Sequence, residues 1–142
     1  MRFNRKQEHP EIRDYGKEPL ICNINHAANM NESFRFALWT GSDMQLTLMS
    51  IPPRGEIGTE MHNDVDQLLS VESGRAKVYM GPSKTDIKQI ATVGEDYVII
   101  IPAGTWHNIV NDTAHPLKLY SLYAPPQHPF GTVQRTKADA EH

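Results

Sequence analysis

The sequence predicts an all-β fold, and two features of its central part support that prediction. Apolar and polar residues alternate with a period of two in several short runs, which is typical of strands that are half buried. Turn-forming residues separate these runs, and no stretch of roughly 10–12 residues there carries a persuasive helical stripe. Many short strands at spacings of about 8–12 residues indicate a sandwich or a barrel.

The first strands are expected in two alternating runs. In SFRFALWTG, residues 33–41, and in MQLTLMSI, residues 44–51, apolar side chains recur at every second position. Further on, VESGRAKVYM reads as a hairpin with Ser73-Gly74 at its turn. The hairpin predicts an antiparallel pair of strands at this point.

Two later runs complete the expected set of strands. The segment DYVIIIP, residues 96–102, is apolar on both faces. This suits a strand covered by the barrel interior on one side and by another sheet or subunit on the other. In LKLYSLYAPP, Leu117, Leu119 and Tyr123 share one face, so we expect a last half-buried strand there.

By its length the chain is expected to form one domain, residues 1–142. The alternating runs place the barrel core at about residues 33–125. Residues 1–20 are polar and read as an N-terminal arm, with at most a short helical piece. Residues 126–142 read as a short C-terminal tail that forms a helical turn or frays.

Composition narrows the class of partner. The net charge is −3, whereas nucleic acid and anionic membranes favour a basic face, so we expect neither as a partner. The longest apolar run, YVIII, is far shorter than the roughly 20 residues that span a bilayer, and the N-terminus lacks a secretory signal. The single cysteine, Cys22, allows no intramolecular disulfide. A cytoplasmic protein that binds a small molecule is the simplest expectation.

Two separate segments supply candidate metal ligands. Glu60 and His62 are two residues apart, so on an extended chain they share a face. Gln67 is out of phase with His62, but a bulge or turn within residues 63–66, NDVD, would restore the phase. His107 begins a strand after the turn PAGT. All four side chains are therefore predicted to point inward on neighbouring strands.

The second of these segments resembles the second sequence motif of small single-domain cupins. That motif runs G, five to seven residues, P-x-G-x-x-H, three residues, N. Its positions are matched here by Gly94, Pro102, Gly104, His107 and Asn111, with seven residues in the first gap.

The first cupin motif is matched with substitutions. That motif runs G, five residues, H-x-H, three or four residues, E, six residues, G. If the five residues are counted strictly from Gly55, Met61 occupies the position of the first histidine. With the histidine spacing kept instead, the motif positions fall on Gly55, Glu60, His62, Gln67 and Gly74. Two of the family's four ligand positions then carry a different residue type.

The resemblance implies a cupin double-stranded β-helix, or jelly-roll barrel, with a divalent metal in its mouth. It implies Glu60, His62, Gln67 and His107 as the metal ligands, and Zn, Fe or Mn suits such a set. One carboxylate and one amide replace one imidazole and one carboxylate, so the formal charge of the ligand set is preserved. Gln67 has two open roles: it ligates the metal directly, or it is a buried amide that orients Glu60 or a metal-bound water. Cupins of this size are commonly homodimers, so a homodimer is expected.

Three further residues are candidates for substrate binding: Trp106, Tyr123 and His128. The segment YAPPQHPFGT, residues 123–132, combines prolines, a histidine and an aromatic just after the last expected strand. One interpretation folds it over the barrel mouth and brings His128 near the metal. The other packs it on the outside of the barrel or across a dimer seam.

The expected function is a metal-dependent enzyme acting on a small polar molecule, isomerase-like, with a sugar-related substrate as one option. The metal would polarise a carbonyl, with Glu60 or a metal-bound hydroxide as the catalytic base. Only Arg54, Arg75 and Lys77 are evident candidates for holding a phosphate, which weakens a sugar-phosphate substrate. The alternatives are a non-haem Fe dioxygenase and a non-catalytic barrel that binds a small ligand or is purely structural.

Overall fold

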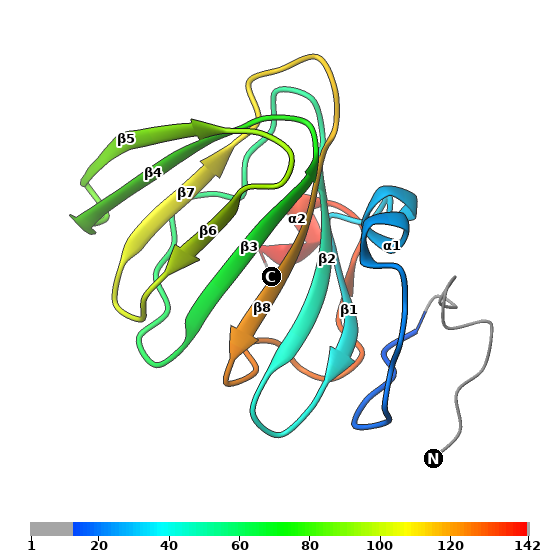
Figure 1. Ribbon diagram of the computed structural model, residues 1–142. Coiled ribbons are helices and arrows are strands. Elements are labelled where there is room, and N and C mark those ends of the chain that lie inside the picture. Colours follow the sequence, from blue (N-terminus) through cyan, green and yellow to red (C-terminus); the bar gives the residue numbers. More distant parts are fainter. Residues whose placement is uncertain (1–12, 142) are drawn as a thin grey trace.

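The computed structural model describes residues 13–141 and consists mostly of antiparallel strands (Figure 1). In that part of the chain the strands are β1 (Arg35–Thr40), β2 (Gln45–Ile51), β3 (Asp66–Ser73), β4 (Ala76–Ser83), β5 (Asp86–Val93), β6 (Val98–Ile101), β7 (Trp106–Val110), β8 (Leu117–Ala124) and β9 (Val133–Gln134). One sheet has the order β6-β3-β8-β2-β1-β9, and the other has the order β5-β4-β7. The hairpin predicted at Ser73-Gly74 is wrong, because β3 and β4 follow each other there but lie in different sheets, and β4 pairs with β5 and β7. The predicted all-β class is confirmed, and the arrangement is consistent with the expected double-stranded β-helix.

The apolar core lies between the two sheets. Leu69, Leu117 and Leu119 come from the six-stranded sheet, Val78 and Ile109 come from the three-stranded sheet, and all five are buried in one cluster. Burying a side chain of this size contributes about 1.5–3 kcal/mol. This cluster therefore holds the two sheets together.

The other end of the barrel interior is polar. Five side chains that follow the inward phase of β2, β3 and β8 are almost completely buried there: Gln45, Thr47, Gln67, Ser121 and Tyr123. The strand register makes Gln45, Tyr123 and Gln67 lateral neighbours, and it places Thr47 beside Ser121. Buried polar groups are costly unless they have partners. This end of the barrel is therefore where a ligand site is expected.

A helix that the sequence did not predict lies over the outer face of β2, β3 and β8. Helix α1 (Ile24–Met30) begins after Asn23, whose side chain accepts a hydrogen bond from the His26 backbone at 2.9 Å. Its residues Ala27 and Ala28 are buried in one apolar cluster with Tyr15, Phe36 of β1 and Leu48 of β2. With only seven residues and two small alanines as its buried face, this helix carries no apolar stripe that periodicity could detect.

The described part of the arm, residues 13–20, packs on the same sheet. The Tyr15 backbone N–H donates to the Leu38 carbonyl at 2.8 Å, and the Tyr15 ring is buried in the cluster beneath α1. The short helical piece expected within residues 1–20 lies largely outside the described residues. Where residues 13–20 are described, they form bends and turns.

The C-terminal tail returns to the barrel. Strand β9 pairs with β1, so that Gln134 lies opposite Arg35, and helix α2 (Lys137–Ala140) follows at the position of the expected helical turn. The tail therefore extends the six-stranded sheet at its β1 edge.

Strand β6 forms the opposite edge of that sheet. Ile99 and Ile101 are buried in the core, whereas Val98 and Ile100 are 54% and 62% exposed. Within the described residues, the face of DYVIIIP with Ile99 and Ile101 is covered by the barrel interior, as predicted. The face with Val98 and Ile100 has no sheet or subunit over it there.

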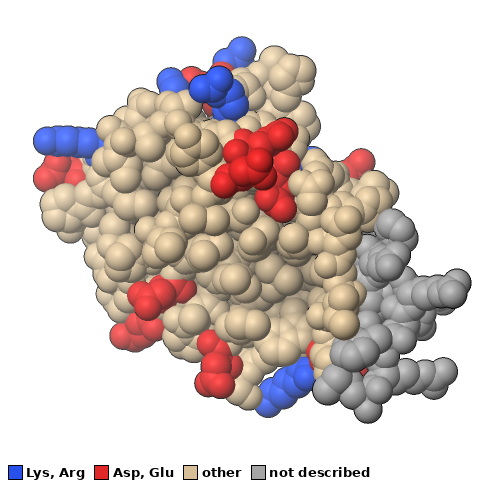
Figure 2. Space-filling view, viewed as in Figure 1, with Lys and Arg blue, Asp and Glu red and all other residues tan. Residues whose placement is uncertain are grey.

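The surface of the described chain carries scattered charges. On the face shown in Figure 2, acidic groups form small separate clusters, and no continuous basic area is visible among the coloured residues. No helix within residues 13–141 is long and apolar enough to cross a membrane.

Candidate metal centre

Strand β7 carries His107 into the polar end of the barrel. The ring is buried, and its Nδ1 lies 2.9 Å from the Thr105 carbonyl oxygen. Because a carbonyl can only accept, Nδ1 is the protonated nitrogen of the neutral ring. Nε2 then keeps a free lone pair, which is the form of imidazole that binds a metal.

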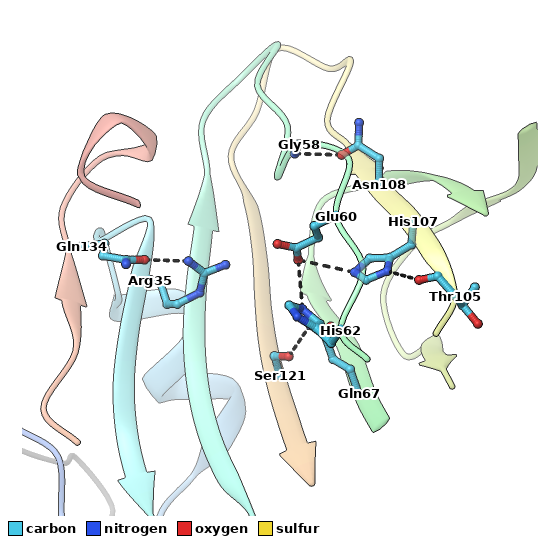
Figure 3. Close-up of polar contacts among 10 residues, drawn as sticks. All are labelled: Arg35, Gly58, Glu60, His62, Gln67, Thr105, His107, Asn108, Ser121 and Gln134. Atoms are coloured by element: carbon cyan, nitrogen blue, oxygen red, sulfur yellow. Dashed lines mark hydrogen bonds and ion pairs between the residues drawn. The ribbon is translucent and has the colours of Figure 1, made fainter. Parts of the chain in front are cut away.

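The backbone of β7 also positions Glu60. Two hydrogen bonds of 2.9 Å join the backbones of Glu60 and His107 reciprocally, so the two residues lie side by side. Two residues earlier, Gly58 has a φ of 104°, and its N–H donates to the Asn108 side chain at 2.9 Å (Figure 3). That φ favours glycine over other residues. The sequence therefore supplies a glycine where the chain must turn to bring Glu60 inward.

Glu60, His62 and His107 converge on one point (Figure 3). The Oε1 atom of Glu60 lies 3.5 Å from Nε2 of His62 and 3.4 Å from Nε2 of His107. The three ligand atoms all lie within 4.8 Å of one another. These distances are long for hydrogen bonds, and each of the three atoms is buried without a hydrogen-bond partner in the described structure.

This donor set fits a divalent metal. Two imidazole nitrogens and one carboxylate oxygen are common ligands of Zn²⁺ and Fe²⁺. A metal at the point of convergence would satisfy all three unpartnered atoms together. The cluster is thus a possible metal site, which agrees in part with the predicted divalent metal; nothing in the geometry selects one metal.

The electrostatic surroundings keep Glu60 ionised. Burial by itself would raise the pKa of the Glu60 carboxyl, because it disfavours the charged form. The neighbouring rings of His107 and His62 outweigh burial and hold that pKa well below its usual range. A carboxylate with such a low pKa is well suited to bind a cation and is a weak proton acceptor.

Gln67 lies on the predicted inward face. Residues 63 and 64 form a bend before β3 starts at Asp66, in the segment where a turn was expected to restore the phase. The amide Nε2 of Gln67 donates to Ser121 Oγ at 2.9 Å, and its Oε1 is buried without a partner. The amide oxygen is therefore free to contact a metal, although direct ligation by Gln67 stays a prediction.

Tyr123 and His128 lie next to this cluster. The Tyr123 ring centroid is 5.9 Å from that of His62 and 5.2 Å from that of His128, and both contacts are edge-on. Gln45 holds the tail in place, because its Oε1 accepts from the His128 backbone at 2.9 Å and its Nε2 donates to the His128 carbonyl at 2.9 Å. The tail therefore follows the interpretation that brings His128 near the candidate site.

Trp106 is not part of this arrangement. It directly precedes His107 in β7, and successive side chains of a strand point to opposite faces. Its side chain therefore lies on the other face of the strand from the metal-ligand candidates. The predicted substrate-binding role of Trp106 has no support from its position.

The sequence reasoning missed several interior residues, above all Arg35, Gln45, Thr47 and Ser121. All four are buried, and a signal for them was present. Thr47 and Gln45 alternate with Leu46 and Leu48, but the apolar residues were taken as the buried set. Because α1 covers the apolar face of these strands, their polar face is the one that lines the barrel.

This fold and the His–Glu cluster define a β-barrel with a candidate metal site in its polar end. The chain belongs to the cupin family: the family described as "Cupin domain" matches residues 47–123, which is more than half of its length. The matched range runs from β2 to the end of β8. It includes all four predicted metal ligands.

Individual relatives support the same assignment. Over 129 residues the chain is 54% identical to the uncharacterized protein YrkC of Bacillus subtilis (strain 168), covering 91% of this chain and 69% of that protein. It is 39% identical over 114 residues to the uncharacterized protein L612 of Acanthamoeba polyphaga mimivirus, covering 80% and 69% of the two chains. The crystal structure of BH2720 from Bacillus halodurans superposes with a TM-score of 0.85 at 50% identity, covering 92% of this chain and 98% of that one.

Proposed function

We propose that this cupin binds one divalent metal ion through Glu60, His62 and His107, and that it is a metal-dependent enzyme acting on a small polar molecule. The observation that carries the proposal is the convergence of three buried, unpartnered ligand atoms within 4.8 Å of one another. Unpartnered polar atoms are rare in protein interiors and call for an explanation. A shared cation explains all three.

The protein's own residues prepare the site for that role. A bound divalent metal supplies Lewis-acid polarisation of a substrate oxygen. The Thr105 carbonyl fixes the His107 ring with Nε2 facing inward, and the low pKa of Glu60 keeps its charge available for the metal. We therefore assign Glu60 as a ligand in preference to the catalytic base.

Two neighbours are suited to form hydrogen bonds with a substrate. Burial raises the pKa of the Tyr123 hydroxyl, so Tyr123 stays neutral and can donate a hydrogen bond. Burial, followed by the charge of Arg35, lowers the pKa of His128 to about 4, so its ring is neutral at neutral pH. The buried Nε2 of His128 has no partner within the described residues and can accept a hydrogen bond from a substrate. A donor and an acceptor beside a Lewis acid favour isomerase-like chemistry.

The second candidate is oxygen chemistry at iron. It is favoured by the composition of the cluster, because two histidines and one carboxylate are the ligand set of non-haem Fe²⁺ oxygenases. The two candidates differ in what they consume. An oxygenase requires O₂ and Fe²⁺, whereas an isomerase works under nitrogen with redox-inert Zn²⁺.

The metal part of the proposal is tested by elemental analysis of protein purified without added metal. We expect about one divalent metal per chain in the wild type and in the control His115→Ala, whose side chain is exposed. Glu60→Ala and His107→Ala should each retain less than about a tenth of that amount of metal, because each variant lacks a side chain that binds the metal directly. Stoichiometric metal in His107→Ala would overturn the assignment.

The catalytic part is tested with a panel of small hydroxy- and oxo-compounds, each incubated with and without a chelator. Product that disappears with chelator, and returns when metal is restored, supports an enzyme. Running the same panel under nitrogen separates the isomerase from the oxygenase. Ligand binding without turnover across the panel would indicate a non-catalytic barrel instead.

A further inference from the structure

We propose that Arg35 binds a carboxylate group of the substrate, so that the substrate is a small carboxylate-bearing anion held between Arg35 and the metal ligands. The metal end of this inference rests on the proposed function; the Arg35 end does not. None of the cations considered from the sequence lies inside the barrel: Arg54 and Arg75 are exposed, and Lys77 forms an ion pair with Asp112 at 2.6 Å.

Arg35 is a buried cation without an anionic partner. Its residue exposure is 4%, and no aspartate or glutamate in residues 13–141 forms an ion pair with it. Its Nη1 donates to the neutral Gln134 Oε1 at 2.6 Å, whereas its Nε is buried and has no partner among the described residues. A buried charge costs several kcal/mol unless it is paired. An anion that arrives from solution would supply the missing partner.

The Arg35 side chain reaches the polar end of the barrel. It starts opposite Met49 in the β1–β2 register, so it follows the inward phase of the sheet. Its charge acts on both Tyr123 and His128. The charge of Glu60 also acts on the pKa of Tyr123 and on that of His128. Tyr123 and His128 therefore connect the Arg35 end of the interior with the metal-ligand end.

Arg35 and the metal-ligand residues face the same part of the barrel interior. In Figure 3 the Arg35 guanidinium and the Glu60 carboxylate extend toward the same region from opposite sides. No ion pair joins Arg35 to Glu60 within residues 13–141. Thr47, a diagonal neighbour of Arg35 on the inward face, has an Oγ1 that is buried without a partner. This hydroxyl offers a second hydrogen bond at the Arg35 end.

The charges favour an anion, and the geometry favours a carboxylate. The positive charges of a divalent metal and of Arg35 together exceed the single negative charge of Glu60. The metal-loaded interior would therefore carry a net positive charge. A planar guanidinium matches the planar carboxylate group. A phosphate dianion would need more than one cation at that end to balance its charge. Among the described residues, Arg35 is the one buried lysine or arginine, so a carboxylate is the better match.

The exposure of the side chains sets the orientation of the ligand. The Glu60 side chain is 30% exposed, whereas Arg35 is almost fully enclosed. A ligand that enters past Glu60 would place its carboxylate at Arg35 and its remaining oxygen atoms near the metal ligands. Molecules with an oxygen function at each end, such as short dicarboxylates, are therefore suitable probes.

The test measures binding of malonate and succinate to metal-loaded protein by calorimetry, with malonamide and inorganic phosphate as comparison probes. We expect the wild type to bind at least one dicarboxylate more tightly than malonamide or phosphate. Arg35→Gln should weaken that binding by about 10–100-fold, because a hydrogen-bonded charge pair is lost. The dicarboxylate affinity of Arg35→Lys should lie between those of the wild type and Arg35→Gln, since lysine keeps the charge but lacks the planar guanidinium. Arg75→Gln is the matched surface control and should bind like the wild type.

Two further readouts separate a binding role from a structural one. Metal content should be unchanged in Arg35→Gln, because Arg35 is not a ligand. The melting temperature of the metal-free variant should fall by no more than about 3 °C, since removing an unpaired buried charge relieves a cost. A variant that fails to fold would show a structural role and would count against the proposal, as would a dicarboxylate affinity in Arg35→Lys equal to that of the wild type.

Other outcomes are equally decisive. Equal dicarboxylate binding by Arg35→Gln and the wild type overturns the inference, and tighter binding of phosphate than of either dicarboxylate overturns the carboxylate class. If the wild type takes up no metal, the proposed function fails, and calorimetry on metal-free protein still decides whether Arg35 binds the anion. If metal binds but no anion does, this inference alone fails.

Discussion

The His107 ring illustrates how one backbone contact prepares a metal ligand. Its Nδ1 donates to the Thr105 carbonyl only two residues away, so the turn that starts β7 also sets the tautomer of the ring. Glu60 lies beside it through a reciprocal pair of backbone hydrogen bonds. Both side chains are therefore oriented before any metal arrives, which reduces the cost of ordering them on binding.

His128 makes stability depend on pH. Burial, with a further contribution from Arg35, lowers the pKa of its ring to about 4 from an ordinary value of 6.5. Between these values the unfolded chain binds the proton and the folded chain does not. Stability is therefore lost as pH falls through that window and is retained above it.

We expect His128→Gln to remove part of this acid sensitivity. At pH 5 the wild type should have lost about 2 kcal/mol through this group relative to pH 8, and the variant should not show that loss. Urea unfolding in the presence of a chelator at both pH values measures the difference. The exposed control His115→Gln should behave like the wild type, and an equal pH dependence in His128→Gln would refute the assignment.

Residue spacing predicted the metal-ligand candidates better than it predicted the rest of the interior. Glu60, His62 and His107 occur in motif positions on extended chain, where a spacing of two defines a shared face. Arg35 was not singled out, because alternation shows which residues share a face but not which face is inward. The inward face is the one left uncovered from outside, and part of the outer cover is α1, a seven-residue helix with no periodic signal.

Among the secondary-structure elements, the C-terminal tail is the one that completes the polar interior. It supplies His128 beside Tyr123, and it supplies Gln134 as the partner of Arg35. The composition of YAPPQHPFGT did not reveal whether it lies over the mouth or outside, because the contact that settles the question comes from a distant strand. That contact is the Gln45 side chain of β2, which bonds the tail backbone.

We expect Gln45→Leu to loosen the tail without unfolding the barrel. Gln45 is completely buried and accepts hydrogen bonds from the backbone N–H groups of Gln127 and His128. Leaving those groups unpaired should cost about 2–4 kcal/mol locally. Limited proteolysis should then cleave within residues 125–134 at least about tenfold faster than in the wild type. Gln89→Leu, an exposed site on β5, is the control; equal cleavage rates in Gln45→Leu and the wild type would contradict the account.

At the scale of the whole molecule, β6 leaves one sheet edge open. Within residues 13–141 its backbone pairs with β3 on one side only, and Val98 and Ile100 are more than half exposed. Open edges with apolar side chains tend to pair with another chain. A second copy related by a twofold axis is the simplest partner, because the same edge then meets itself. This is also the homodimer expected from the sequence, and it stays a prediction.

The prediction is that the protein is a dimer in solution and that Ile100→Lys shifts it to the monomer. Ile90→Lys is a matched control, since Ile90 is 58% exposed but lies on β5 in the other sheet. Light scattering after size-exclusion chromatography gives the mass of each. A monomeric wild type, or a dimer lost in Ile90→Lys and kept in Ile100→Lys, would rule out β6 as the interface.

The central claim, that Glu60, His62 and His107 share one metal ion, is tested most directly by anomalous X-ray scattering from crystals of metal-loaded protein. The account predicts one strong anomalous peak about 2.0–2.2 Å from a Glu60 carboxylate oxygen and from Nε2 of both histidines. A strong peak elsewhere in the molecule, or density at this position that shows water and no metal at full loading, would contradict it.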